Sequence, residues 1–213
     1  MIKVVDFTSK PLSLMGKVAS GCWNSSPKDT SKVAIECINS GHGRVLEFAD
    51  VIIEIDGYSA RMIRELYTHI VGTSRLQAST RYINYGDFEF IIPKSISSDE
   101  KAMDLYSHIM IETSDTYGKL QDLGIPKEDI ANILPLGMVS KMYLKINVRA
   151  ILHMAEVRMC NRAYHEFREF MEELQSVISQ LDNEWEYIAS QMKPKCEVYG
   201  YCNERNSCYK QGG

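Results

Sequence analysis

The segment from Arg64 to Asn84 reads RELYTHIVGTSRLQASTRYIN, and the rest of the chain is organised around it. Its first part, taken with the residues from Tyr58 onward, has apolar residues at helical spacing. This spacing predicts an amphipathic helix that places His69 at its C-terminal end. After Gly72 the pattern changes to a polar run that leads into aromatic residues. The stretch therefore joins a helix to a polar segment whose side chains need partners.

The polar segment carries three side chains that are well suited to an anion. If residues 77–81 are extended, alternation places Gln77, Ser79 and Arg81 on one face. An amide, a hydroxyl and a guanidinium on one face can bind a phosphate or a carboxylate, because Arg offers a planar fork of donors. The alternative is a polar loop whose Arg81 pairs with an acidic residue at the surface, since charged loop residues are usually solvated.

Length and composition are those of an ordinary soluble globular protein. The chain has 213 residues, of which 45% are hydrophobic and 24% are charged. This length leaves room for one sizeable domain and a small appendage. We expect one domain over residues 1–192 and a cysteine-containing tail over residues 193–213.

Charge and hydropathy exclude several classes of partner. The formal net charge is −4 and the isoelectric point is about 5.8, so the chain lacks the basic surface that binds nucleic acid. No apolar run approaches the roughly 20 residues of a membrane span, and the N-terminal segment MIKVVDFTSK lacks a signal-peptide core. We therefore expect a cytoplasmic protein with no membrane or nucleic-acid partner.

The six cysteines give no recognisable metal pattern. The last three, Cys196, Cys202 and Cys208, are each separated by five residues, whereas zinc sites usually contain a pair two to four residues apart. The chain is also too long for a disulfide-stapled mini-protein. We interpret the cysteines as free thiols and predict no metal site, while a metal knuckle or a redox pair in the tail stays open.

The order of the elements indicates an α+β fold. Strands are expected at residues 3–7, 47–56, 87–93 and 140–146, and helices at 12–23, 31–39, 98–123, 126–134, 147–159 and 163–192. A few strands separated by long helices predict a single domain with a mixed or antiparallel sheet. The chain lacks the Gly-rich turn of a dinucleotide-binding Rossmann domain.

A second informative segment, INVRAILHMAEVRMCNRAYHEFREF, covers residues 146–170. Arg149 and His153 are four residues apart and share a helical face, while Arg158 lies about 140° further round from His153. The residues between them are mostly apolar, which predicts a largely buried helix. Buried arginines are rarely without partners. In a third segment, SGHGRVLEF, His42 stands between two glycines, where backbone can approach a ligand closely.

These motifs together resemble the flavin-dependent thymidylate synthases. In that family a basic His-containing triplet is followed after seven or eight residues by Ser, then by Arg and an aromatic residue, as in His69, Ser79, Arg81 and Tyr82. The family's C-terminal half carries a pattern that matches Asn147, Arg149, His153 and Arg158 in order. ILPLGM, residues 133–138, is similar to the family's Leu-Pro-Leu stretch. The resemblance covers about residues 30–175 in four segments.

The resemblance implies a homotetramer of α+β subunits whose active sites are shared between subunits. It implies conversion of dUMP to dTMP, with methylenetetrahydrofolate as the carbon donor and reduced FAD as the hydride donor. A nicotinamide cofactor, NADPH, would reduce the flavin. The expected small-molecule partners are therefore dUMP, the folate, FAD and NADPH.

The resemblance also implies roles for individual residues. Arg158 would face the pyrimidine and act catalytically by stabilising an anionic ring. The FAD-contacting residues would be His42, His69, Asn147, Arg149 and His153. The dUMP-binding residues would be Glu65, Gln77, Ala78, Ser79, Arg81 and Arg158. Ser79 is better suited to phosphate than to nucleophilic attack, because the sequence places no base beside it.

The chain departs from the family pattern at several positions. The triplet is usually Arg-His-Arg, but here it is Thr68, His69 and Ile70, so two cations are lost. A usual Gln is Glu65, and an expected Arg is Ala131. We hypothesise that Arg64 and Arg75 compensate because they lie close to the altered positions. The departures leave two alternatives open: formation of another 5-substituted pyrimidine nucleotide, or a non-catalytic nucleotide-binding homologue.

Overall fold

The structure is a computed structural model that describes residues 1–208. The chain packs as two compact units. The first unit contains residues 1–54, 69–75 and the chain from residue 143 onward, and the second contains residues 55–68 and 76–142. The expected division into a domain over 1–192 and a tail over 193–213 stays a prediction, and residues 209–213 of that tail lie outside the described residues.

A four-stranded sheet has the strand order β1-β2-β4-β3. Its strands are β1 (Ile2–Phe7), β2 (Asp50–Ser59), β3 (Thr73–Gln77) and β4 (Val139–Asn147). Hydrogen bonds from Val148 N to Ala49 O and from Ala60 N to Met138 O show that β2 and β4 run antiparallel. Residues alternate between buried and partly exposed along β2, as expected for a strand with one face on the core. The sheet confirms the predicted α+β class.

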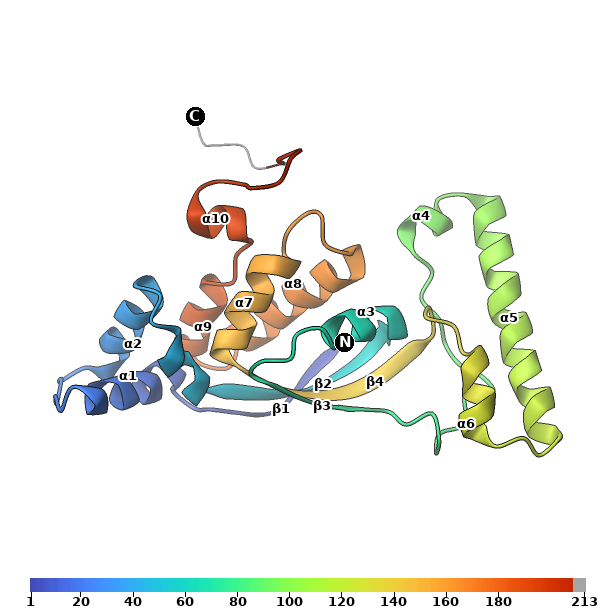
Figure 1. Ribbon diagram of the computed structural model, residues 1–213, viewed down its shortest axis with the longest axis horizontal. Helices are drawn as coiled ribbons and strands as arrows, with labels where there is room; N and C mark the ends of the chain where they lie inside the picture. The colour runs from blue at the N-terminus through green and yellow to red at the C-terminus, as the bar shows by residue number, and fades with distance from the viewer. Residues whose placement is uncertain (209–213) are drawn as a thin grey trace. The chain divides into compact units, whose positions relative to one another are not determined.

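The first unit contains most of the helices. These are α1 (Pro11–Cys22), α2 (Thr30–Asn39), the 3-10 helix η1 (Gly43–Phe48), α7 (Val148–Arg158), α8 (His165–Ser179), α9 (Asn183–Ser190) and α10 (Lys195–Tyr199). Helix α8 packs against β1 and α7 (Figure 1). Its side chains Phe167 and Phe170 are fully buried. The core beneath α7 and α8 is therefore aromatic.

The second unit is built around one long helix. It contains α3 (Ala60–Leu66), α4 (Lys94–Ser97), α5 (Glu100–Asp122), α6 (Lys127–Ile130) and the 3-10 helix η2 (Ala131–Ile133). Helix α6 packs against α5 (Figure 1). Met110 and Tyr117 of α5 are buried in a cluster with Phe88, Ile130 and Met138. This cluster anchors the segment that follows the Ser79–Arg81 turn.

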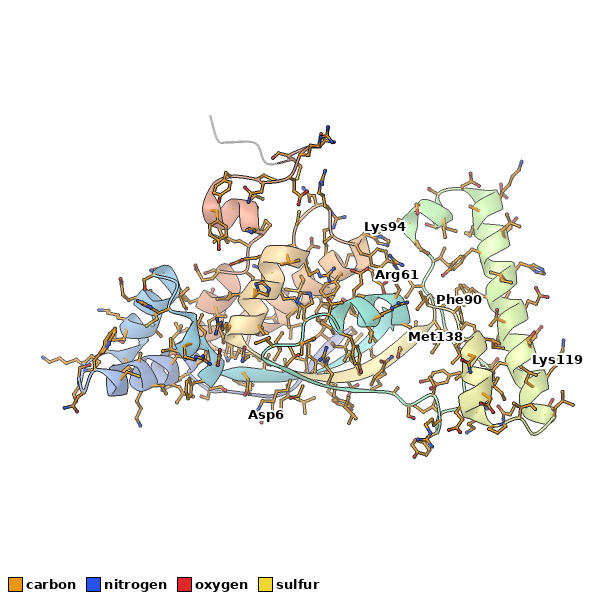
Figure 2. The ribbon with its side chains drawn as sticks, viewed as in Figure 1. Asp6, Arg61, Phe90, Lys94, Lys119 and Met138 are labelled. Atoms are coloured by element: carbon orange, nitrogen blue, oxygen red, sulfur yellow. The ribbon has the colours of Figure 1, made fainter. Side chains whose placement is uncertain are left out.

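The expected strand at 87–93 is wrong. The segment makes a single antiparallel bridge, between Phe90 and Met138 (Figure 2). Phe88 and Phe90 instead pack in the cluster against α5. Phe88 and Phe90 stand at alternate positions, which is the pattern of a strand. Here their side chains pack against helix α5 instead.

The single helix expected at 163–192 is also wrong, because it is two helices, α8 and α9. Asp182 adopts an extended conformation and its carboxylate accepts the N–H groups of Glu184 and Trp185. An aspartate in this position begins a new helix. The break lets the buried Trp185 donate its indole N–H to Thr8 O at 2.9 Å.

The segment from residue 64 to residue 84 differs from the predicted helix and extended segment in two places. Helix α3 ends at Leu66, so His69 lies beyond the helix rather than in it. The extended segment is β3, which ends at Gln77, and the chain turns after Ser79. No helix among residues 1–208 is long and apolar enough to cross a membrane.

Candidate functional site

His69 and Arg158 lie together in the first unit, although 89 residues separate them. Arg158 is the last residue of α7, and its Nε–H donates to His69 Nε2 at 2.9 Å. The guanidinium carbon lies 4.6 Å from the ring centre of Phe167. The His69 ring lies 5.8 Å from the same phenyl ring. The ring of Phe167, which is buried on α8, therefore packs against both the Arg158 and the His69 side chains.

The imidazole of His69 is neutral at pH 7. Burial and then, in decreasing order of effect, the positive charges of Arg158, His153 and Arg75 together lower the pKa of His69 to about 4. Because Nε2 accepts the hydrogen bond from Arg158, the single ring proton lies on Nδ1. The Nε–H group of Arg158 therefore donates to a neutral imidazole rather than to a carboxylate. This hydrogen bond does not neutralise the positive charge of Arg158.

Two further side chains act electrostatically on His69. His153, on α7, and Arg75, on β3, both disfavour its imidazolium form. The structure therefore brings together His69, His153 and Arg158, although the sequence pattern placed His153 and Arg158 in different directions around their helix. The compensating role expected for Arg75 stays a prediction.

Asn147 joins the start of α7 to the turn that follows His69. Its Oδ1 accepts the Ala150 N–H at 2.9 Å and caps α7, and its own N–H donates to Gly72 O at 3.0 Å. Gly72 has φ +76°, and a Cβ there would lie 2.6 Å from Asn147 Oδ1. Only glycine adopts this conformation readily. Asn147 is thus held in place at two points: its side chain bonds to the first turn of α7, and its backbone N–H bonds to the turn at Gly72.

Arg149 lies on the exposed face of α7 and contacts the loop that carries His42. Its Nη1 pairs with Glu47 Oε1 at 2.5 Å, and this hydrogen bond holds the pKa of Glu47 below its usual range. His42 is exposed at the start of η1. A Cβ on Gly43 would lie 3.1 Å from Arg149 Nε, so the backbone passes close to the guanidinium.

The second unit contains the predicted anion-binding residues in a turn. The Gln77 amide donates to Ser140 Oγ at 2.9 Å, and the Ala78 N–H donates to Lys141 O at 2.8 Å. Ser79 Oγ accepts the Arg81 N–H at 3.2 Å. The expectation that Gln77, Ser79 and Arg81 share a face of one extended segment is wrong, because the strand stops at Gln77.

Two acidic residues of the second unit form ion pairs with arginines. Arg81 Nε donates to Glu128 Oε2 at 2.8 Å, and both side chains are more than half exposed. This is the surface pairing that the sequence left open as an alternative. Glu65, on α3, lies 3.7 Å from Arg61 one helical turn earlier. The carboxylate of Glu65 is therefore partly neutralised within its own helix.

Comparison with known proteins decides the family. The model of the family described as "Thymidylate synthase complementing protein" matches residues 3–182. The flavin-dependent thymidylate synthase of Pyrococcus abyssi is 32% identical over 180 residues, which cover 80% of this chain and 73% of the relative. This chain belongs to the flavin-dependent thymidylate synthase family.

Other members of the flavin-dependent thymidylate synthase family match nearly the whole chain. The Pyrococcus furiosus synthase is 28% identical over 220 residues, covering 96% of this chain and 90% of the relative. A crystal structure of the Helicobacter pylori flavin-dependent thymidylate synthase, complexed with FAD and dUMP, matches with a TM-score of 0.71. That match covers 90% of this chain and 99% of the other at 19% identity, so it shows a common fold.

The chemistry of the first unit fits a flavin nucleotide. Arg149 and His153 form an exposed polar face on α7, and the Gly43 backbone lies close to the Arg149 guanidinium. Imidazole, guanidinium and amide groups are suitable donors for diphosphate and ring oxygens. That these residues hold the flavin stays a prediction.

The sequence did not identify three residues of this arrangement. Phe167 lies nine residues after Arg158 in the quoted segment, yet nothing in the pattern indicates that it packs under the guanidinium. Glu128 and Ser140 contact Arg81 and Gln77 through tertiary packing. Their separations of 47 and 63 residues leave no local signal.

Proposed function

We propose that this chain methylates dUMP to dTMP, using methylenetetrahydrofolate as carbon donor, FAD as cofactor and NADPH as reductant. The observation that carries the proposal is Arg158, held on Phe167 and bonded to a neutral His69. Bound FAD, once reduced, supplies the hydride.

Arg158 provides a fixed positive charge for the pyrimidine. The stacking on Phe167 and the bond to His69 Nε2 fix the plane of the guanidinium before any ligand binds. A cation held in this way stabilises negative charge that develops on the uracil ring without reorganising during the reaction. Because His69 is neutral, it orients the guanidinium without cancelling its charge.

Ser79 and Arg81, with Gln77, Ala78 and Glu65 nearby in the sequence, would bind the nucleotide phosphate. The Arg81 guanidinium already binds a carboxylate, Glu128, in an exposed pair. A phosphate offers the same fork of acceptors with more charge. We infer that the dUMP phosphate replaces Glu128 as the partner of Arg81.

The flavin would be held by His42, Asn147, Arg149 and His153, with His69 adjacent. Arg75 supplies one of the positive charges lost from the triplet, since it is near enough to His69 to lower the pKa of that imidazole. Arg64 lies in the last turn of α3 and remains the other candidate. We further propose a cytoplasmic homotetramer with shared active sites, which is the assembly that the family resemblance implies.

The experiment that tests this function is product analysis. Purified protein is incubated anaerobically with dUMP, FAD, NADPH and methylenetetrahydrofolate, and the nucleotide product is identified by mass spectrometry. Appearance of dTMP supports the proposal. A hydroxymethyl product would instead favour the alternative 5-substituted pyrimidine, for which the Thr68 and Ile70 replacements are the motivating observation. Unchanged dUMP with no flavin retained would overturn both and leave a nucleotide-binding homologue.

A further inference from the structure

Four of the six cysteines line one cavity in the first unit. The cavity has a volume of about 620 Å³ and lies between the end of α7 and the chain around α10, which packs on α7 (Figure 1). Its cysteines are Cys160, Cys196, Cys202 and Cys208. The other two cysteines, Cys22 on α1 and Cys37 on α2, do not line it. The candidate catalytic residues are also absent from its lining.

The four thiols come from two separate parts of the chain that other contacts already join. Cys160 follows Arg158 by two residues, whereas the other three thiols lie in the segment 196–208. The Asn161 amide donates to Cys208 Sγ at 3.5 Å. Arg162 pairs with Glu204 at 2.5 Å. The segment after α10 is thus held next to the end of α7 by its polar side chains.

The four thiols share one cavity. Thiols grouped in this way stay protonated in the absence of a cation, because neighbouring thiolates would repel one another. A divalent metal ion reverses this preference, because it binds thiolates and deprotonates its ligands.

We propose that Cys160, Cys196, Cys202 and Cys208 together bind one Zn²⁺ ion. Four thiolates around one ion is an established composition of a structural zinc site. Among residues 1–208 no three His, Cys, Asp or Glu side chains already form a metal-binding group, so the proposal requires the tail thiols to move towards Cys160 when the ion binds. Each ion displaces four thiol protons, which leaves a site of charge −2 next to Lys195 in the cavity lining.

The site ties the tail to the helix that carries the candidate catalytic arginine. Cys160 is the ligand nearest in sequence to Arg158, and the other three ligands follow α9 and the end of the core. Zinc would therefore close a long loop between residues 160 and 196 and hold the C-terminal end of α7. Its role is structural, because four protein ligands leave no open position for catalysis.

The test uses the full chain, purified under reducing conditions without chelator. We expect about one zinc ion per chain by elemental analysis, and a thiolate-to-metal absorption band when Co²⁺ replaces zinc. Cys160→Ser and Cys196→Ser should each weaken Co²⁺ binding at least about tenfold. Cys22→Ser is the matched control, since this exposed thiol lies on α1, and it should bind the metal as the unaltered chain does.

A second measurement keeps the proposal falsifiable if the serine variants do not fold. In the unaltered protein, zinc should protect the four cavity thiols from alkylation while Cys22 still reacts, as read by peptide mapping. Six equally reactive thiols and no bound metal would overturn the proposal. A disulfide between cavity cysteines in the reduced-handling control would overturn it as well, in favour of a redox pair.

Discussion

The two arginines proposed to act on the nucleotide are held in opposite ways. Arg158 is partly buried, stacked on Phe167 and bonded to the neutral imidazole of His69. Arg81 lies in an exposed turn and pairs with Glu128, and both side chains are more than half exposed. Arg158 is held by packing against a buried ring, whereas Arg81 is held by a surface ion pair and lies 5.9 Å from the centre of the exposed Tyr82 ring.

The difference indicates a division of work. A fixed guanidinium can stabilise charge as it develops, because no reorganisation is needed at that moment. An arginine on the surface pays little to exchange one anion for another, since exposed ion pairs contribute only about 0–1 kcal/mol. We therefore expect substitution of Arg158 to impair turnover, and substitution of Arg81 to impair binding.

Arg158→Ala should have the largest effect. We expect kcat to fall about 10³-fold, which corresponds to about 4 kcal/mol of lost transition-state stabilisation. Arg158→Lys should recover only part of this loss, because an ammonium keeps the charge but not the planar stack on Phe167. Steady-state dTMP formation measures both, with Arg205→Ala in the exposed tail as the surface control. Unchanged kcat in Arg158→Ala would remove Arg158 from the catalytic group.

Arg81→Ala should weaken dUMP binding while leaving kcat at saturation nearly unaltered. Loss of a charge-assisted hydrogen bond of about 1–3 kcal/mol raises the Kd for dUMP roughly 5- to 150-fold. Calorimetric titration measures this Kd, and deoxyuridine provides the control because it lacks the phosphate. If the variant lost affinity for deoxyuridine to the same extent, Arg81 would not be a phosphate ligand.

The pH dependence of stability should show the lowered pKa of His69. In the unfolded chain the imidazole titrates near 6.5, whereas in the folded protein its pKa is about 4. The unfolded state therefore binds more protons between these values, so stability is fully present above pH 6.5 and is lost as pH falls towards 4. We expect about 1 kcal/mol after allowing for solvent screening of the half-buried ring.

Urea unfolding at a series of pH values measures this slope. His69→Asn is the matched variant, because asparagine keeps an acceptor for Arg158 but does not titrate. Carboxylates titrate in the same window, so the informative quantity is the difference between the two curves. Parallel curves would show that the imidazole is not shielded from protonation in the folded state.

Glu128→Gln should produce the smallest effect, and in the opposite direction to Arg81→Ala. The substitution removes the anion that occupies Arg81, so dUMP affinity should rise by no more than a few-fold. The same titration measures it. A decrease in affinity would mean that Glu128 positions Arg81 for the phosphate instead of competing with it.

The sequence predicted the parts of the fold whose burial follows a simple period. β2 and β4 were recognisable because alternate residues such as Ile53, Ile55, Met142 and Leu144 are fully buried. β3 was not, because it is an edge strand of polar residues whose Leu76 is 71% exposed. Its period carries no hydrophobic signal. The false strand at 87–93 is the converse, since its alternation arises from packing on a helix.

The candidate site was predicted as a set of residues but not as an arrangement. His69 and Arg158 were both identified from their motifs, yet their hydrogen bond depends on how α7 meets the turn after α3. Helical angles alone placed Arg158 and His153 in different directions, yet Arg158 donates a hydrogen bond to His69 and both side chains act electrostatically on its imidazole. Phe167, which packs against both side chains, lies on a different helix, α8, and no sequence motif marks it.

The close contact at Gly72 restricts how the turn after His69 and helix α7 can be positioned. The turn after His69 and the first turn of α7 meet at Gly72 and Asn147, with no room for even one methyl group between them. His69 lies three residues before this joint, and Arg158 lies eleven residues after it along a straight helix. The two partners of one hydrogen bond are therefore aligned from a single point, so an insertion or deletion on either side would separate them without altering a single contact residue.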